Sequence, residues 1–214
     1  MIKILILIII IIIISIFLLR NENENFSNID IINDIFSQSF LSLKPDKEKY
    51  DKNNISYGEI SNEGIEILSN LTNNKNLFID LGCGTGRCLA YAILNGFNKA
   101  KGVELVLERV EYAKKQIELL PSYMKDNIEI KQDDILKLNK DYFFGANVIW
   151  ISNLLFPVEI NDKIFKLLSD NIDKNTIVVV SNMQNETYDL KFIKEMIVPM
   201  SWDKNSVVKI FMKV

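Results

Sequence analysis

The 214-residue chain contains no histidine, and this absence removes several kinds of chemistry at once. It excludes histidine metal ligands, histidine general bases and every serine or cysteine triad that depends on an imidazole. The two cysteines, Cys83 and Cys88, are too few for a disulfide scaffold and lack the paired spacing of a metal site. We therefore expect free thiols in a reducing compartment, with proton transfer left to other groups.

Excess positive charge is also lacking, because 25 Lys and Arg residues stand against 28 Asp and Glu residues, for a net charge of −3. A broad nucleic-acid surface needs clustered lysines and arginines, so nucleic-acid binding is not expected. An acidic surface would suit a cationic protein substrate better. The length allows one domain with a sizeable core and an appendage, but no second domain.

Only one apolar run is long, and it lies at the amino terminus. Residues 4–19 are apolar except for Ser15, with Lys3 before them and Arg20 after them. As a helix this run would span roughly 24 Å, slightly less than the roughly 30 Å hydrocarbon core of a bilayer. The small residues of a cleavage site are missing, so we predict that residues 1–20 are an uncleaved, single-pass membrane anchor. A removed leader is the alternative.

Residues 21–56 form a linker that includes a predicted helix. The polar residues 21–25 act as a spacer, and apolar side chains then recur at helical spacing, at Ile29, Ile32, Phe36 and Phe40. This spacing predicts an amphipathic helix that packs on the folded part and ends before Pro45. Charges of both signs alternate in residues 44–54, which is typical of a solvated loop.

The remaining chain, residues 57–214, is organised around positions 76–105. An apolar run at positions 77–81, interrupted by Asp80 near its end, is typical of a strand buried on both faces of a parallel sheet. Gly82, Gly84 and Gly86 follow, where the absence of a Cβ permits positive φ and close approach of a ligand. Helical spacing resumes at residues 87–94, and Glu104 ends the next strand. The pattern predicts a nucleotide-cofactor site at this edge of the sheet.

The spacing of these glycines differs from a dinucleotide fingerprint, since the third glycine comes one residue early. The D-x-G-x-G-x-G form at positions 80–86 instead resembles motif I of class I S-adenosylmethionine (SAM) methyltransferases. That resemblance implies a cofactor without a pyrophosphate. The loop then covers only an amino acid and a ribose, and the carboxylate of Glu104 is placed to accept the ribose hydroxyls.

Strands and helices alternate along the rest of this region. We predict a doubly wound, Rossmann-like α/β fold with a mostly parallel sheet and ligands over the carboxyl ends of its strands. Residues 191–198 and 207–214 form a predicted antiparallel hairpin at the sheet edge. The other predicted strands include 128–131, 148–152 and 177–180, and the predicted helices are 61–71, 107–117 and 160–167.

Several separate stretches resemble one family, the non-SET histone-lysine methyltransferases named for disruption of telomeric silencing. Tyr57-Gly58-Glu59 resembles its cofactor-loop motif, residues 78–86 resemble its motif I, and Gly102-Val103-Glu104 resembles its ribose-binding strand end. Asp134, residues 148–156 and Ser201-Trp202 extend the match over most of residues 50–214. The chain departs from the family where Ser152-Asn153 replaces two adjacent asparagines, and it lacks a basic nucleosome-binding extension.

The resemblance implies a role for each matching residue. Glu59 and Asp80 would contact the methionine part of SAM, Glu104 the ribose and Asp134 the adenine amino group. Asn153 would lie at the reaction centre and, with Tyr57 and Phe156, form the channel for an incoming amine. The less specific interpretations are that Glu59 stabilises the following helix through its dipole, Asp134 caps a turn and Trp202 is a core aromatic.

The predicted activity is therefore methyl transfer from SAM to an accessible lysine of a protein, with the catalytic part in the cytosol beside a membrane. Two alternatives share the same loop. One is another class I methyltransferase acting on a mitochondrial protein or a small molecule. The other is a membrane-tethered module that binds SAM without catalysis.

Overall fold

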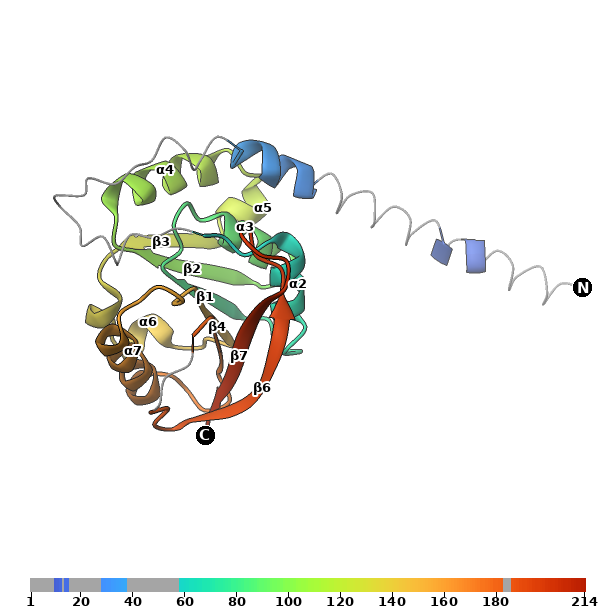
Figure 1. Ribbon diagram of the computed structural model, residues 1–214. Coiled ribbons are helices and arrows are strands. Elements are labelled where there is room, and N and C mark those ends of the chain that lie inside the picture. The colour runs from blue at the N-terminus through green and yellow to red at the C-terminus, as the bar shows by residue number, and fades with distance from the viewer. Residues whose placement is uncertain (1–9, 13, 16–27, 38–57, 183–185) are drawn as a thin grey trace, which may run out of the picture.

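The computed structural model describes residues 10–12, 14–15, 28–37, 58–182 and 186–214. Within these residues the chain builds a seven-stranded sheet with the strand order β3-β2-β1-β4-β5-β7-β6 (Figure 1). The strands are β1 (Leu77–Leu81), β2 (Lys99–Glu104), β3 (Ile128–Gln132), β4 (Val148–Ile151), β5 (Ile177–Val180), β6 (Leu190–Val198) and β7 (Ser206–Lys213). The helices are α2 (Asn62–Ser69), α3 (Arg87–Leu94), α4 (Leu107–Glu118), α5 (Ser122–Lys125), α6 (Lys140–Phe143), α7 (Val158–Asn171) and the short 3₁₀ helix η2 (Ile135–Lys137).

Strands β1 to β5 run parallel, as the apolar runs predict. β1 is central and pairs with both β2 and β4, and its residue Asp80 lies opposite Gly102 on one side and Trp150 on the other. All residues of β1 and β4 are buried, which explains why these strands read as continuous apolar runs. The doubly wound α/β fold predicted from the sequence is confirmed.

Helices cover both faces of the sheet, and successive strand residues alternate between them. Phe78 and Trp150 point into a cluster formed with α2, α3, α4 and α5, whereas Ile79 and Ile151 point into a second cluster formed with α6 and α7. Figure 1 shows α3 and α4 on one side of the strands and α6 and α7 on the other. These two clusters fix the sheet between its helices.

The carboxyl-terminal strands form the predicted antiparallel hairpin. β7 pairs antiparallel with β5, and β6 pairs antiparallel with β7 at the sheet edge. A single bridge joins Ile60 to Met200, in the loop of this hairpin. The hairpin therefore brings its loop against the segment that precedes α2.

A helix at residues 28–35 lies in the range where the apolar spacing predicts one. Its side chains Ile32 and Phe36 are fully buried and belong to the same cluster as α3. The packing role expected of this segment is thus confirmed for the residues that the structure describes. The charged stretch at positions 44–54 lies outside those residues.

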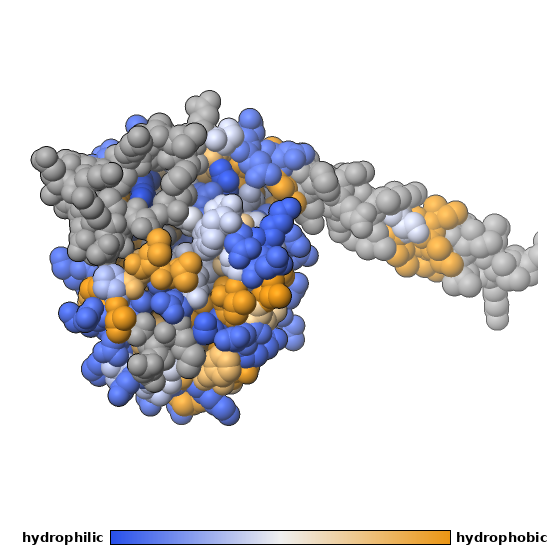
Figure 2. Space-filling model, viewed as in Figure 1, coloured by the Kyte–Doolittle hydropathy of each residue, from blue (hydrophilic) through white to orange (hydrophobic). Residues whose placement is uncertain are grey.

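Most of the predicted anchor, residues 1–9, 13 and 16–20, also lies outside the described residues. The described residues 10–12 and 14–15 are helical, and the side chains of Ile10, Ile11, Ile12 and Ile14 are about half exposed. Figure 2 shows this stretch as an apolar patch. Within the part of the chain that the structure describes, none of the helices has both the length and the apolar character needed to cross a bilayer.

Candidate functional site

Three adjoining pockets lie at the carboxyl ends of β1, β2 and β4, and Gly58 and Ser152 line all of them. The first, which we call the strand-end pocket, has a volume of about 160 Å³ and is lined by Glu104, Asp134 and other residues. The loop pocket is a smaller cavity of about 20 Å³ at the glycine turn. The tryptophan pocket, of about 270 Å³, includes Trp202 in its wall.

The glycine turn has the backbone conformation that the sequence predicts. Gly82, Gly84 and Gly86 all have positive φ, at 96°, 56° and 81°. The amides of Gly82 and Cys83 both donate to the carbonyl oxygen of Val103, at 2.8 and 3.0 Å, which ties the turn to β2. A Cβ on Gly86 would come within 2.8 Å of Ile130 Cδ1, so a larger residue there would be strained in its backbone and would also displace that side chain.

Glu104 connects the glycine turn to the end of β2. Its side chain is buried, and its two carboxylate oxygens accept hydrogen bonds from the amides of Gly84, at 3.0 Å, and Val106, at 2.9 Å. Arg109 lies 3.8 Å from the same carboxylate. Each oxygen keeps a further lone pair, and Glu104 lines the strand-end pocket, so a ligand hydroxyl has an acceptor there.

Asp80 lies in the wall of the loop pocket and is almost completely buried. Burial raises the pKa of its carboxyl group from 3.8 to about 7, the thiol of Cys88 opposes this shift through a hydrogen bond, and the negative charges of Glu104 and Glu59 add to it. A buried carboxylate with no cation beside it is costly. This position therefore favours a ligand that brings positive charge.

Glu59 also lines the loop pocket and is held by several neighbours. One carboxylate oxygen accepts a hydrogen bond from Thr85 Oγ1 at 2.9 Å, and the other lies 3.0 Å from Arg87 Nη1. Its backbone amide donates a hydrogen bond to Ser201 Oγ, and its backbone carbonyl oxygen accepts one from the amide of Ser201. The hydroxyl of Ser61 caps α2 by accepting from the amide of Gly64, and a dipole interaction of Glu59 with this helix stays a prediction.

Asp134 has the capping role that the sequence suggests, and it also lines a pocket. Its carboxylate accepts a hydrogen bond from the amide of Leu136 and so caps the helix η2, and the residue also lines the strand-end pocket. Asp134 and Glu104 thus face one cavity from the ends of neighbouring strands. Its contact with an adenine stays a prediction.

Asn153 lies just after the end of β4, as the sequence predicts. It is fully buried, and its amide nitrogen donates to Asn161 Oδ1 at 2.8 Å and to the carbonyl oxygen of Asn182 at 3.1 Å. Its amide oxygen accepts from the amide of Asn182 at 2.9 Å. The neighbouring Ser152, and not Asn153, lines the three pockets. A direct role of Asn153 at the reaction centre stays a prediction, and Tyr57 lies outside the described residues.

Sequence reasoning missed Ser152 and Arg109 as pocket-lining residues. Ser152 directly follows β4 at the edge where the pockets open, so its position carried a usable signal. Arg109 lies in the first turn of α4, where an arginine usually reaches solvent, and its approach to Glu104 is a tertiary contact.

These residues suit a ligand that combines a polar nucleoside with a cationic amino acid. Glu104 and Asp134 supply acceptors in the strand-end pocket, and the anionic group of Asp80 and Glu59 surrounds the loop pocket. The tryptophan pocket opens beside both through Gly58 and Ser152. A second molecule there would lie next to the first.

Comparisons with known proteins point in the same direction. Residues 41–204 match the model of a family described as histone methylation protein DOT1. A search of curated proteins found no match.

Several solved structures are similar in fold. An RNA methyltransferase from Salinibacter ruber in complex with S-adenosylhomocysteine has a TM-score of 0.54 at 18% identity, covering 71% of this chain and 89% of that one. The glycopeptide N-methyltransferase MtfA complexed with S-adenosylhomocysteine has a TM-score of 0.57 at 10% identity, covering 72% and 89%. A TehB-like SAM-dependent methyltransferase from Corynebacterium glutamicum has a TM-score of 0.52 at 14% identity, covering 71% and 88%. At these identities the likeness concerns the fold.

Proposed function

The chain belongs to the histone methylation protein DOT1 family, and from this premise we propose that it transfers the methyl group of SAM to a lysine side chain of a protein. The family match and the similar solved structures support SAM-dependent methyl transfer, and the lysine acceptor is our proposal. The observation that carries the proposal is that three pockets meet at Gly58 and Ser152. Carboxylates line the strand-end pocket and the loop pocket, and the walls of the tryptophan pocket are mostly apolar.

The residues present fit SAM. Glu104 would hold the ribose hydroxyls and Asp134 the adenine, while Asp80 and Glu59 would face the cationic methionine end. The raised pKa of Asp80 supports this arrangement, because a buried carboxyl group that lacks a cation is satisfied by one. When bound, SAM supplies an electrophilic methyl group on a sulfonium.

The tryptophan pocket is suited to the aliphatic stem of a lysine. Among the described residues that line it none is ionisable: they are Gly58, Ser152, Leu154, Leu155, Phe156, Ser201 and Trp202. These apolar walls, once a protein substrate covers them, would disfavour the charged ammonium and so lower the pKa of the entering amine. The lone pair needed for attack is then available, and the released proton passes to water. In-line placement and exclusion of water supply most of the rate.

Asn153 takes a supporting part in this proposal. Its bonds to Asn161 on α7 and to Asn182 after β5 fix the start of the loop that continues through Leu154 and Phe156. Because those two residues line the tryptophan pocket, Asn153 would position the acceptor channel from behind.

We further propose that residues 1–20 anchor the protein in a membrane, with the catalytic part in the cytosol. The support for this is the apolar run at positions 4–19 and the supply of SAM in the cytosol. The protein substrate would then be one that is accessible near that membrane.

The cofactor assignment is tested by calorimetric titration of the full-length protein in detergent with SAM. We expect Glu104→Ala to weaken binding by about 1–3 kcal/mol, because it removes a charged acceptor from a buried site. Glu118→Ala is the matched control, since that carboxylate is exposed and pairs only with Lys125 among the contacts seen. Unchanged affinity in a folded Glu104→Ala variant would remove this residue from the site.

The acceptor assignment is tested with SAM labelled in its methyl group. Incubation with a cell lysate, followed by hydrolysis of the labelled proteins, should yield methylated lysine. Label in a small molecule or in another amino acid would favour a different class I methyltransferase. Tight SAM binding without any transfer would favour the non-catalytic module.

A further inference from the structure

We propose that Arg87 is a positioning residue for the cofactor: it holds the carboxylate of Glu59 at the loop pocket, and the helix at residues 28–35 holds Arg87 in turn. This inference rests on the proposed function, because it concerns how tightly the loop pocket binds SAM. The helix precedes the residues that match the family model, 41–204.

Arg87 forms an ion pair with Glu59. Arg87 Nη1 lies 3.0 Å from Glu59 Oε2, and Thr85 Oγ1 donates to Glu59 Oε1 at 2.9 Å. Both carboxylate oxygens are therefore fixed from the glycine turn and the start of α3. The two charged side chains are only about a fifth exposed, so water screens this ion pair less than a surface pair.

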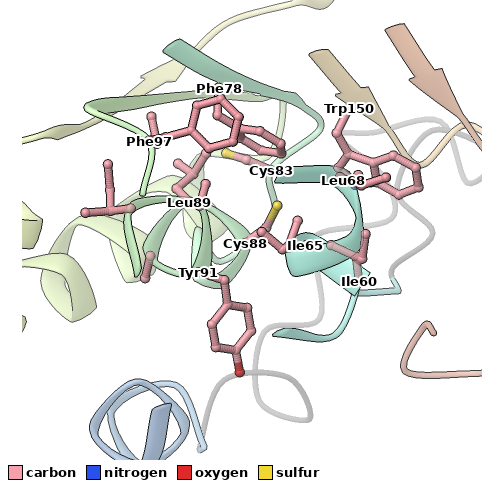
Figure 3. Packing of buried hydrophobic residues seen from close by; sticks show 14 of the residues in the cluster. Ile60, Ile65, Leu68, Phe78, Cys83, Cys88, Leu89, Tyr91, Phe97 and Trp150 are labelled. Carbon is pink, nitrogen blue, oxygen red and sulfur yellow. The ribbon is translucent and has the colours of Figure 1, made fainter. Parts of the chain in front are cut away.

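Arg87 also contacts the segment that contains the helix at residues 28–35. Arg87 Nη2 donates to the backbone carbonyl oxygen of Phe36, and the guanidinium lies 6.0 Å from the centre of the Phe36 ring. A second bond joins the same elements, because the hydroxyl of Tyr91 donates to Asn33 Oδ1 at 2.6 Å. Figure 3 shows Tyr91 pointing from α3 toward this helix. Phe36 directly follows the helix and is fully buried, so this segment supports Arg87 from the apolar core.

Ser201 holds the backbone of Glu59 from the opposite side. The amide of Glu59 donates to Ser201 Oγ at 3.0 Å, and its carbonyl oxygen accepts from the amide of Ser201 at 2.8 Å. The segment from Gly58 to Ile60 is thus held between α3 and the loop of the β6–β7 hairpin. Because Gly58 lines all three pockets, a shift of Glu59 would change the cofactor and acceptor sites together.

Arg87 also offsets negative charge at the loop pocket. Glu59 contributes to the raised pKa of Asp80, so the loop pocket already concentrates negative charge. The guanidinium offsets one of these charges and keeps the Glu59 carboxylate in a single orientation.

The test measures SAM affinity by calorimetry on the full-length protein carrying Arg87→Met, Glu59→Gln or both. We expect each single change to weaken binding about tenfold, which is about 1.4 kcal/mol, and the double change to be no weaker than Glu59→Gln alone. Arg87→Lys should restore binding only in part, because an ammonium lacks the planar fork. Lys166→Met is the control, since it breaks an exposed ion pair with Asp170. Additive losses in the double variant, or an unchanged Arg87→Met, would overturn the proposal.

The contribution of the helix is tested with Phe36→Leu and Ile32→Val, which trim two fully buried side chains of the same segment. Phe36→Leu removes the ring beneath the guanidinium, so SAM affinity should fall several-fold. Ile32→Val should leave affinity unchanged even where thermal unfolding shows a similar loss of stability. Equal losses of affinity would mean that the helix acts only through stability, against the proposal.

Hydrogen exchange separates this inference from the proposed function. The amide of Glu59 should exchange faster in Arg87→Met and Phe36→Leu than in the wild type and in Ile32→Val, with no SAM present. Unchanged protection would overturn the support of Glu59 by Arg87. A wild-type protein that protects this amide but fails to bind SAM would instead overturn the proposed function.

Discussion

At the scale of single residues, Asp80 has the most unusual environment among the carboxylates of the site. Burial raises the pKa of its carboxyl group to about 7, so near neutral pH about half of the molecules carry a proton there. A cationic ligand prefers the ionised form. Binding of SAM should therefore release a proton below this pKa.

The first prediction follows for the pH dependence of SAM affinity. Affinity should be highest above pH 7 and should fall as pH drops through 7, by at most about tenfold per pH unit. Calorimetry in buffers of different ionisation enthalpy would measure both the affinity and the proton release. Asp80→Asn should bind more weakly and lose this pH dependence, and a flat profile in the wild type would contradict the prediction.

The same pKa predicts how Asp80 affects the stability of the protein without its cofactor. The folded-state pKa of about 7 lies above the usual aspartate value of 3.8, so the folded state binds more protons than the unfolded state between these values. The contribution of Asp80 to the free energy of unfolding should therefore fall as pH rises from about 4 to about 7. Above pH 7, Asp80→Asn should raise the unfolding temperature. A lower unfolding temperature for that variant would mean that the carboxylate is compensated.

Asn153 leads to a different prediction, because the structure shows what its amide contacts. Asn153→Ala leaves Asn161 and the backbone of residue 182 without their buried partners, so we expect a loss of about 1–3 kcal/mol in the free energy of unfolding. Turnover should fall more than SAM affinity, because the affected loop lines the acceptor pocket.

Asn161→Ala is the matched comparison, since it breaks the same bond from α7. If the two variants lose turnover equally, Asn153 acts by positioning the loop. A much larger loss in Asn153→Ala at similar stability would place its amide at the reacting amine.

At the scale of elements, the β6–β7 hairpin completes a site that the parallel strands begin. Its loop carries Ser201 and Trp202 to the segment before α2, and the Ile60–Met200 bridge joins the two. A Cβ on Gly58 would lie only 2.2 Å from Trp202 Cζ3, so the indole packs directly on this glycine. The wall of the tryptophan pocket therefore depends on a small residue at position 58.

We predict that Gly58→Ala displaces the indole and lowers turnover by up to about a hundredfold, because small misplacements of a substrate have large effects on rate. Thermal unfolding should show that the protein stays folded. Adding Trp202→Leu, which shortens the side chain, should recover part of the packing but not the channel wall. Full activity in Gly58→Ala would exclude close contact between Trp202 and the acceptor.

At the scale of the whole molecule, the site is built from residues 58–202, while the described part of the chain begins well before it. Among the described residues, those that line the three pockets all lie at position 58 or beyond, yet the helix at residues 28–35 belongs to the main apolar cluster. The boundary of the functional unit should accordingly lie between the predicted anchor and this helix.

We predict that removing residues 1–20 leaves a folded protein with the SAM affinity of the full chain, because no described contact of the site involves them. Removing residues 1–37 should weaken SAM binding, since it deletes the support of Arg87. Calorimetry and circular dichroism on both truncations would measure this. Aggregation or loss of binding in the shorter deletion would mean that the anchor packs on the domain.

The sequence by itself determined the local structure and the class of fold. Three elements follow one another directly in the sequence: the strand from Leu77 to Leu81, the glycine turn and the helix after it. Their structure depends on contacts between residues close in sequence, which the spacing of apolar residues and the conformational freedom of glycine specify. Glu104 could be assigned to the same edge as Asp80 because parallel strands end together. The antiparallel tail was predictable from its two apolar runs separated by a turn.

Only the tertiary structure decided which partners the polar groups take. Arg87 hydrogen-bonds to Phe36, 51 residues away in the sequence, and Glu59 hydrogen-bonds to Ser201, 142 residues away. No local sequence pattern predicts contacts between residues so far apart in the chain. The raised pKa of Asp80 depends on the burial that packing creates. For Asn153, the strand end fixes its position. Its amide bonds to Asn161 and Asn182 because α7 packs on one face of the sheet and β5 pairs beside β4, which leaves buried polar groups that must be paired.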